Sequence, residues 1–179
     1  DVERSRGLGD VYKRQHLLRN GSWQENFALL EKYNLSFDLQ LYPEQMKEAA
    51  KFLSDFPNVP IVIDHAGSPY DQTDSGLRLW REGLSALAKL PKIHIKLSGF
   101  GMYDSDWSYD SSLLLFQTIL DLFGAHRIMW GSNFPVESLM KSYSFCVKQM
   151  MKWISPLSPD EQGLIASGTA KKFYRVTLL

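Results

Sequence analysis

Strand-like and helix-like segments alternate along the chain from residue 22, and this alternation restricts the fold more than any other feature. Short apolar runs predict strands at residues 35–41, 59–66, 93–97 and 127–130. Apolar side chains at helical spacing predict helices at about 23–33, 43–56, 77–87, 115–123, 139–154 and 159–168, with a further turn at 170–174. Because strands that alternate with helices pair in parallel with right-handed crossovers, we expect an α/β domain with a parallel sheet.

Two architectures fit this order of elements. The predicted strands start roughly 24 to 34 residues apart, which is the length of one βα unit. Such units build either an open, doubly wound sheet or a closed (β/α)₈ barrel, and periodicity alone does not separate the two. In both architectures a ligand site lies at the carboxyl ends of the strands, so the residues there are the candidates for function.

Composition excludes several classes of function. The chain has 179 residues, 44% of them hydrophobic, which is enough apolar material for a folded core. Lys+Arg 20 balances Asp+Glu 20, so the basic field of a nucleic-acid-binding protein is missing. No apolar run reaches the roughly 18 residues of a membrane span, and a single cysteine, Cys146, fits a reducing cytoplasm. We therefore expect a cytoplasmic protein with a small-molecule substrate and no nucleic-acid or membrane partner. The composition is compatible with a homo-oligomer.

The first 15 residues do not match the rest of the chain. Residues 1–15 are polar and without periodicity, and the string DVYKRQ resembles a translated sequencing adapter. We treat residues 1–15 as a non-native leader, place the domain at residues 16–179 and expect the native N-terminus to lie further upstream.

His65 stands at the end of the second predicted strand. Side chains alternate along a strand, so we expect His65 to share a face with Ile61 and Ile63, and Asp64 to face outward toward a helix. An imidazole at the mouth of a barrel could polarise a carbonyl group or bind a metal ion. A structural histidine bonded to a loop carbonyl is the alternative, and for Asp64 we expect a helix cap or a basic partner.

Polar residues also end the next two predicted strands. We predict that Asn133 orients substrate or water, since an amide can donate and accept hydrogen bonds but cannot take a proton. Lys96, Ser98 and Ser132 are predicted to bind substrate, with the lysine suited to a carboxylate. The same positions also fit structural roles, as a turn residue for Asn133 and as a lysine lying between helices for Lys96.

These strand ends, taken in order, resemble the amidohydrolase-related family that contains sugar-lactone and pyrone-dicarboxylate lactonases. The matching segments are 37–39 (FDL), 62–67 (VIDHAG), 95–99 (IKLSG), 123–136 (FGAHRIMWGSNFPV), 168–170 (GTA) and 173–174 (FY). The resemblance runs from about residue 22 to the end of the chain. It implies the carboxyl-terminal half of a (β/α)₈ barrel, with the four predicted strands as the fifth to the eighth.

The resemblance also shows two departures from the family pattern. The family's first strand carries a His-x-His pair, and no such pair exists in this chain. After the last strand the family typically has an aspartate that acts as a general base, and here that position is Asn133. The resemblance implies a divalent metal such as zinc, with His65 as a ligand, or equally a metal-independent reaction.

We therefore predict a hydrolase that opens a lactone or similar cyclic ester of a small carboxylated or sugar-acid substrate. His65 and Asn133 would be its catalytic residues. Two alternatives stay open at this stage: a catalytically silent half-barrel, and a doubly wound ligand-binding domain without chemistry. The order of the strands in the sheet separates the last of these from a barrel.

Overall fold

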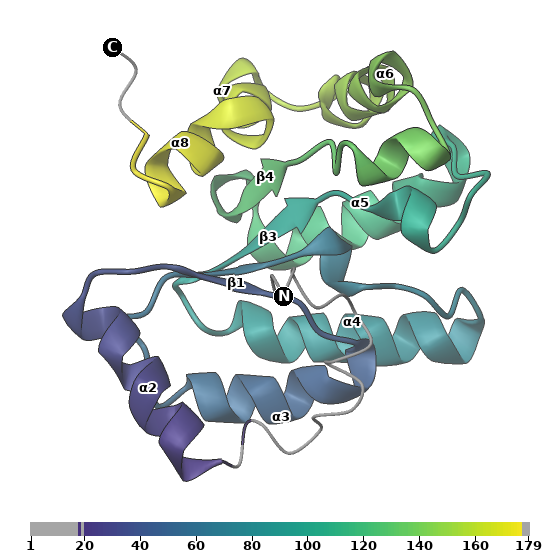
Figure 1. Ribbon diagram of the computed structural model, residues 1–179. Coiled ribbons are helices and arrows are strands. Elements are labelled where there is room, and N and C mark those ends of the chain that lie inside the picture. Colours follow the sequence, from purple (N-terminus) through teal and green to yellow (C-terminus); the bar gives the residue numbers. More distant parts are fainter. Residues whose placement is uncertain (1–17, 19, 177–179) are drawn as a thin grey trace, which may run out of the picture.

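The computed structural model of the protein describes residues 18 and 20–176, and a parallel sheet lies at its centre (Figure 1). The strands are β1 (Phe37–Leu39), β2 (Ile61–Ile63), β3 (Ile93–Leu97) and β4 (Ile128–Trp130). All three pairings are parallel, and the order in the sheet is β1-β2-β3-β4. Because the order contains no reversal, the sheet is that of a barrel segment and not that of a doubly wound fold.

Helices connect and flank the strands in the predicted order. They are α2 (Gly21–Lys32), α3 (Pro43–Leu53), α4 (Asp74–Ala88), α5 (Tyr109–Phe123), α6 (Tyr143–Ile154), α7 (Pro159–Gly163) and α8 (Thr169–Phe173), and a π-helical stretch, η6 (Leu164–Gly168), joins the last two. Short 3-10 turns follow or precede strands at η2 (His65–Gly67), η3 (Phe100–Met102), η4 (Ala125–Arg127) and η5 (Val136–Leu139). No helix in the part of the chain that the structure describes is long and apolar enough to cross a membrane.

Local sequence explains where several of these helices begin. Thr73 and Ser108 stand at the N-caps of α4 and α5, where each side chain accepts a hydrogen bond from the first helical turn. Ser158 and Glu161 form a capping box, with Pro159 at the first position of α7. The caps of α4 and α5 fix the points at which the chain passes from a loop at the carboxyl end of the sheet into a helix, and the capping box starts α7 after the turn that follows α6.

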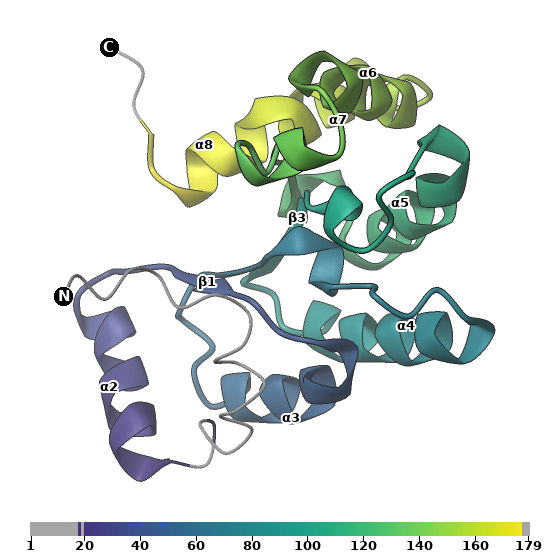
Figure 2. The same cartoon turned by 45° about the vertical axis from the view of Figure 1, so that its right-hand side comes forward.

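One face of the sheet packs against the helices. Side chains from alternate strand positions, such as Ile63 and Ile95, join Trp80 and Leu84 of α4 in the main core. Helices α3 to α6 follow one another around this face, each in contact with the next, as the arc of ribbons in Figure 2 shows. The core therefore lies between the sheet and this layer of helices, as in the wall of a (β/α)₈ barrel.

The opposite face of the sheet carries the other set of alternate residues. Val62 and Met129 form a small second cluster there with Phe173 from α8. The ring of His94 lies 5.0 Å from the ring of Phe173, and its Nδ1 is 3.1 Å from the Lys92 carbonyl oxygen. His94 is thus a structural histidine in the middle of β3.

Two expectations about the elements need correction. The strand predicted at 93–97 is confirmed with these bounds, but the strands predicted at 35–41 and 59–66 are each only three residues long, at Phe37–Leu39 and Ile61–Ile63. The sequence also predicted one helix over residues 139–154, but α6 begins at Tyr143, which is 52% exposed. Leu139 belongs to the separate turn η5 and is 83% exposed. The apolar residues keep a helical spacing in the sequence from Leu139 onward, although the chain is not helical between η5 and α6.

Candidate functional site

The carboxyl ends of the strands bring together most of the predicted site residues. His65 lies in the turn after β2, Ser98 directly after β3, and Ser132 and Asn133 after β4. Because the strands are parallel and adjacent, these ends lie along one edge of the sheet. The site is thus assembled from three successive βα loops, which is where barrel enzymes carry their chemistry.

The turn that holds His65 has a left-handed backbone. His65, Ala66, Gly67 and Ser68 have φ angles between 51° and 71°. Each non-glycine residue in this conformation costs roughly 1–2 kcal/mol, so surrounding contacts must hold the turn. One of them is a hydrogen bond of 2.8 Å that the buried indole Nε1 of Trp80 donates to the Ala66 carbonyl oxygen. Strained segments of this kind concentrate at functional sites.

Ser98 is the side chain that contacts the His65 imidazole. The Oγ atom of Ser98 lies 3.2 Å from Nδ1 of His65. Gly99 lies beneath the same ring, and a Cβ atom at this position would be 2.7 Å from Nδ1. A side chain at position 99 would therefore displace the imidazole, so Ser98-Gly99 both orients the ring and makes room for it.

The environment of His65 favours a neutral imidazole. Burial lowers the pKa of His65 below its ordinary value of 6.5. Asp64 and Glu137 act in the opposite direction and Lys96 adds to the lowering, but burial is the largest effect. A neutral imidazole can donate a hydrogen bond from one ring nitrogen while the other accepts one.

The loop after β4 fixes Ser132 and Asn133 in different ways. The backbone N–H of Phe134 donates to the Ser132 Oγ atom at 3.3 Å. Asn133 has a left-handed backbone with φ 56°, and its amide Nδ2 lies 3.5 Å from the Oε2 atom of Glu137. The amide of Asn133 is therefore linked to a carboxylate four residues further along the chain.

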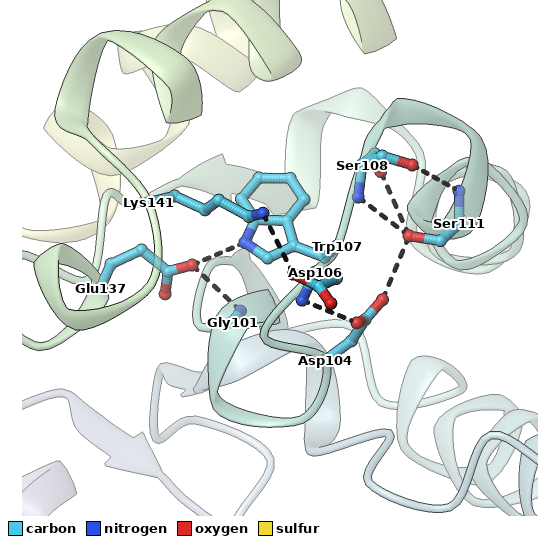
Figure 3. Close-up of polar contacts among 8 residues, drawn as sticks. All are labelled: Gly101, Asp104, Asp106, Trp107, Ser108, Ser111, Glu137 and Lys141. Carbon is cyan, nitrogen blue, oxygen red and sulfur yellow. Dashed lines mark hydrogen bonds and ion pairs between the residues drawn. The ribbon is translucent and has the colours of Figure 1, made fainter.

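Glu137 is a residue of this site that sequence reasoning missed. Its side chain is buried, with the residue 2% exposed, in η5. The backbone N–H of Gly101 and the indole Nε1 of Trp107 donate to its Oε1 atom at 3.0 and 2.8 Å (Figure 3). Only its position close behind the last strand distinguishes Glu137 in the sequence, because a glutamate in a loop is ordinarily exposed.

Lys96 lies on the other face of the sheet, away from Ile63 and helices α3 to α6 and next to Tyr174. Its Nζ atom is 2.6 Å from Oδ2 of Asp38 and 2.7 Å from Oδ1 of Asp64. Burial by itself would lower the pKa of Lys96, but hydrogen bonds with Asp38, Asp64 and Tyr174 outweigh it and raise that pKa above its ordinary value. The structure thus gives this ammonium group two carboxylate partners, and its role in substrate binding stays a prediction.

Asp64 requires a correction. The sequence predicted that it faces outward toward a helix of the surrounding layer, but its ion pair with Lys96 places it on the face opposite to helices α3 to α6, where Phe173 of α8 packs. Ile61 and Ile63 are the residues that face the helices, together with Trp80. Alternation correctly placed Ile61 and Ile63 on one face and Asp64 on the other. Strand β2 is buried on both faces, so the sequence pattern did not show which face packs against helices α3 to α6. The basic partner expected for Asp64 is confirmed.

Ser98 also lines two small cavities at this edge of the sheet. One lies against His65, Phe100 and Trp107, and the other against Ser132 and Glu137. Each has a volume of about 10 Å³, which is room for about one water molecule. The described residues thus form one wall of a site and not a closed pocket for a whole substrate.

The described residues do not fit a complete zinc site. Zinc sites in enzymes have three protein ligands from His, Cys, Asp or Glu. Among residues 18 and 20–176, no group of three such side chains is close enough together to hold a metal ion. His65 could supply one ligand, so a metal at this position would need further ligands from outside the described part of the chain.

Comparison with known proteins assigns the chain to a family. A family model described as amidohydrolase matches residues 6–176, nearly the whole chain. The chain belongs to the amidohydrolase family. This confirms the resemblance seen in the strand ends and, with the strand order, the predicted fold class of an α/β barrel segment.

Relatives of this chain include a protein named as a lactonase and an uncharacterized one. It is 35% identical over 158 residues to an uncharacterized protein of Sinorhizobium fredii, covering 88% of this chain and 53% of that protein. It is 32% identical over 160 residues to an L-fucono-1,5-lactonase of Burkholderia multivorans, covering 82% of this chain and 53% of the lactonase. The chain therefore spans about half the length of these curated relatives.

A solved structure agrees with the fold. A crystal structure of an amidohydrolase from Burkholderia multivorans with bound zinc superposes with a TM-score of 0.83 at 28% identity. The match covers 91% of this chain and 60% of that one. The four-stranded sheet and its helices are therefore part of an amidohydrolase barrel.

Proposed function

We propose that this amidohydrolase chain forms part of a lactonase that opens a cyclic ester of a small sugar acid or carboxylated acid. The observation that carries the proposal is the contact between His65 and Ser98 at the carboxyl ends of two adjacent strands. The similarity to an L-fucono-1,5-lactonase supports it and suggests that lactone as the first substrate to try. A cytoplasmic location and a possible homo-oligomer belong to the same proposal.

His65 would act on the carbonyl oxygen of the lactone. If the Ser98 hydroxyl donates to Nδ1, the hydrogen of the neutral ring lies on Nε2, which is then free to donate to that oxygen. Such a donor stabilises the negative charge that develops on the oxygen when water attacks the ring carbon. The lowered pKa of His65 favours this neutral form at physiological pH.

The loop after β4 would position the attacking water. Asn133 can accept a hydrogen bond from water through Oδ1, and Ser132 adds a hydroxyl group in the same loop. Attack of the water oxygen on the ester carbon, followed by breakage of the ring C–O bond and transfer of a proton to the released oxygen, gives the open hydroxy acid. A bound zinc ion, if the intact protein holds one, would polarise the ester carbonyl and the water.

A His65→Ala variant tests the proposal in the intact protein, meaning the reading frame extended upstream to the length of the lactonase relatives. We expect kcat/KM for L-fucono-1,5-lactone to fall by about 100-fold or more, because a positioned donor is lost. The measurement is lactone hydrolysis followed by the release of acid.

His94→Gln is the matched control, because His94 lies on the opposite face of the sheet against Phe173. This variant should retain activity within about threefold of the parent at a temperature where both are folded. Equal rates for the His65→Ala variant and the parent would contradict the role given to His65. A parent that opens no lactone would overturn the proposed function itself.

A further inference from the structure

The carboxylate of Glu137 has unusual surroundings for a charged group. It is buried, and the ion pairs among the described residues do not include it. Two neutral N–H donors, from Gly101 and Trp107, share its Oε1 atom, and both come from the segment after β3. A buried charge without a cationic partner is costly, so the hydrogen bonds to both of its oxygens must offset that cost.

The second oxygen, Oε2, has the Asn133 amide as its partner. The Nδ2 atom of Asn133 lies 3.5 Å away, at the long end of the range for a hydrogen bond. The reverse orientation of the amide would place the Oδ1 atom of Asn133 against the carboxylate, and two acceptors repel each other. Glu137 therefore selects one of the two orientations of this amide, and leaves Oδ1 as the end that is not bound to the carboxylate.

We propose that Glu137 is a positioning residue that orients the Asn133 amide so that Oδ1 accepts a hydrogen bond from the attacking water. The proposal rests on the lactonase function proposed above. It names the Glu137 carboxylate as the group that, through Asn133, directs the water that attacks the lactone. Glu137 also ties the loop after β4 to the segment that holds Gly101 and Trp107 (Figure 3), and these two bonds fix the carboxylate that the Asn133 amide contacts.

The pairing also gives a physical reason for an amide at position 133. An aspartate there would place a second carboxylate within about the same short distance of Glu137, and two like charges so close in a buried site repel strongly. With Asn133 the pair carries a single negative charge, held on Glu137. Residue types at the two positions should therefore be matched: an amide at one requires a carboxylate at the other.

Three variants of the intact protein test this match: Glu137→Gln, Asn133→Asp and the double substitution. In Glu137→Gln, the new Oε1 keeps its bonds to Gly101 and Trp107, and the new amide nitrogen then faces Nδ2 of Asn133. Two donors repel, so Asn133 turns and points its nitrogen at the water. In Asn133→Asp, two carboxylates face each other. In the double variant, the glutamine nitrogen donates to one aspartate oxygen and the other oxygen faces the water.

We expect each single substitution to lower kcat by about 100-fold with KM changed by less than about threefold, because only the water is misdirected. The double variant should recover to within about tenfold of the parent, a strong departure from additivity. Glu161→Gln, at the exposed capping box of α7, is the matched control and should leave kcat unchanged. If the fold-decrease in kcat of the double variant equals the product of the two single decreases, the proposal is overturned and Glu137 is a structural residue.

A second measurement separates this inference from the proposed function. The midpoints of thermal unfolding of the same variants report the match between the two side chains without any substrate. The double variant should unfold at a higher temperature than either single variant, whereas additive decreases would overturn the match. If the parent opens no lactone but the midpoints show this recovery, the function fails and the Glu137–Asn133 match stands.

Discussion

Lys96 shows how a single side chain contributes to stability on the face of the sheet that lies opposite to helices α3 to α6. Its ammonium group lies between the carboxylates of Asp38, in β1, and Asp64, directly after β2, and the Lys96 side chain is 21% exposed. Replacement by methionine removes the cation and leaves two carboxylates close together. We expect Lys96→Met to lower the free energy of unfolding of the intact protein by about 1–3 kcal/mol, as measured by urea denaturation.

Lys47 supplies the control for this prediction. It forms an ion pair of similar length with Glu82, at 2.7 Å, but the two side chains are 59% and 50% exposed. Lys47→Met should change stability by no more than about 0.5 kcal/mol, since solvent screens such pairs. If Lys96→Met instead leaves stability unchanged and raises KM for a carboxylated lactone, the role predicted from the sequence is correct and the structural one is wrong.

At the level of elements, the close packing of α3 on α4 depends on Gly83. A Cβ atom at this position would lie 2.7 Å from Cβ of Met46 and 2.6 Å from its Sδ atom. Alanine normally stabilises a helix interior by about 1 kcal/mol relative to glycine, but here it would force the two helices apart. We expect Gly83→Ala to destabilise the intact protein by about 1–2 kcal/mol in denaturant unfolding.

Gly163→Ala tests the same substitution where space is available. Gly163 ends α7 with a helical φ of −61°, and nothing lies within 4 Å of the position that a Cβ atom would take. This variant should be more stable than the parent by about 0.5–1 kcal/mol. A stabilising effect at both glycines would mean that α3 and α4 do not pack as closely as the structure shows.

The elements that the sequence predicted correctly are those fixed by local patterns. The alternation of strands and helices follows from the periodicity of apolar residues, and the helix starts at Pro43 and Pro159 follow from local signals for a first helical turn. The contact between His65 and Ser98 follows from the parallel pairing of adjacent strands. The features it missed depend on contacts distant in sequence. The left-handed turn after Ile63 is held by Trp80, and the burial of Glu137 depends on donors from the segment after β3.

The whole molecule presents a sheet with two unpaired edges among its described residues. β1 and β4 each have a single neighbour, and both lie at the ends of the four-stranded order. Unpaired strand edges favour pairing with other chains, and in a closed barrel further strands would cover them. Exposed apolar side chains also follow β4 in the sequence, at Phe134, Val136, Leu139 and Tyr143. These surfaces suit a chain that folds next to further strands.

We therefore expect the 179-residue chain, expressed alone, to self-associate or to lack a cooperative unfolding transition, and the intact protein to unfold cooperatively. The physical reason is that the outer edges of β1 and β4 are covered only when the barrel closes. Sedimentation velocity and urea denaturation of both proteins at the same concentration make the comparison. A monomeric chain of 179 residues with a sharp, reversible transition would show that the sheet is stable without further strands, and would contradict the half-barrel interpretation.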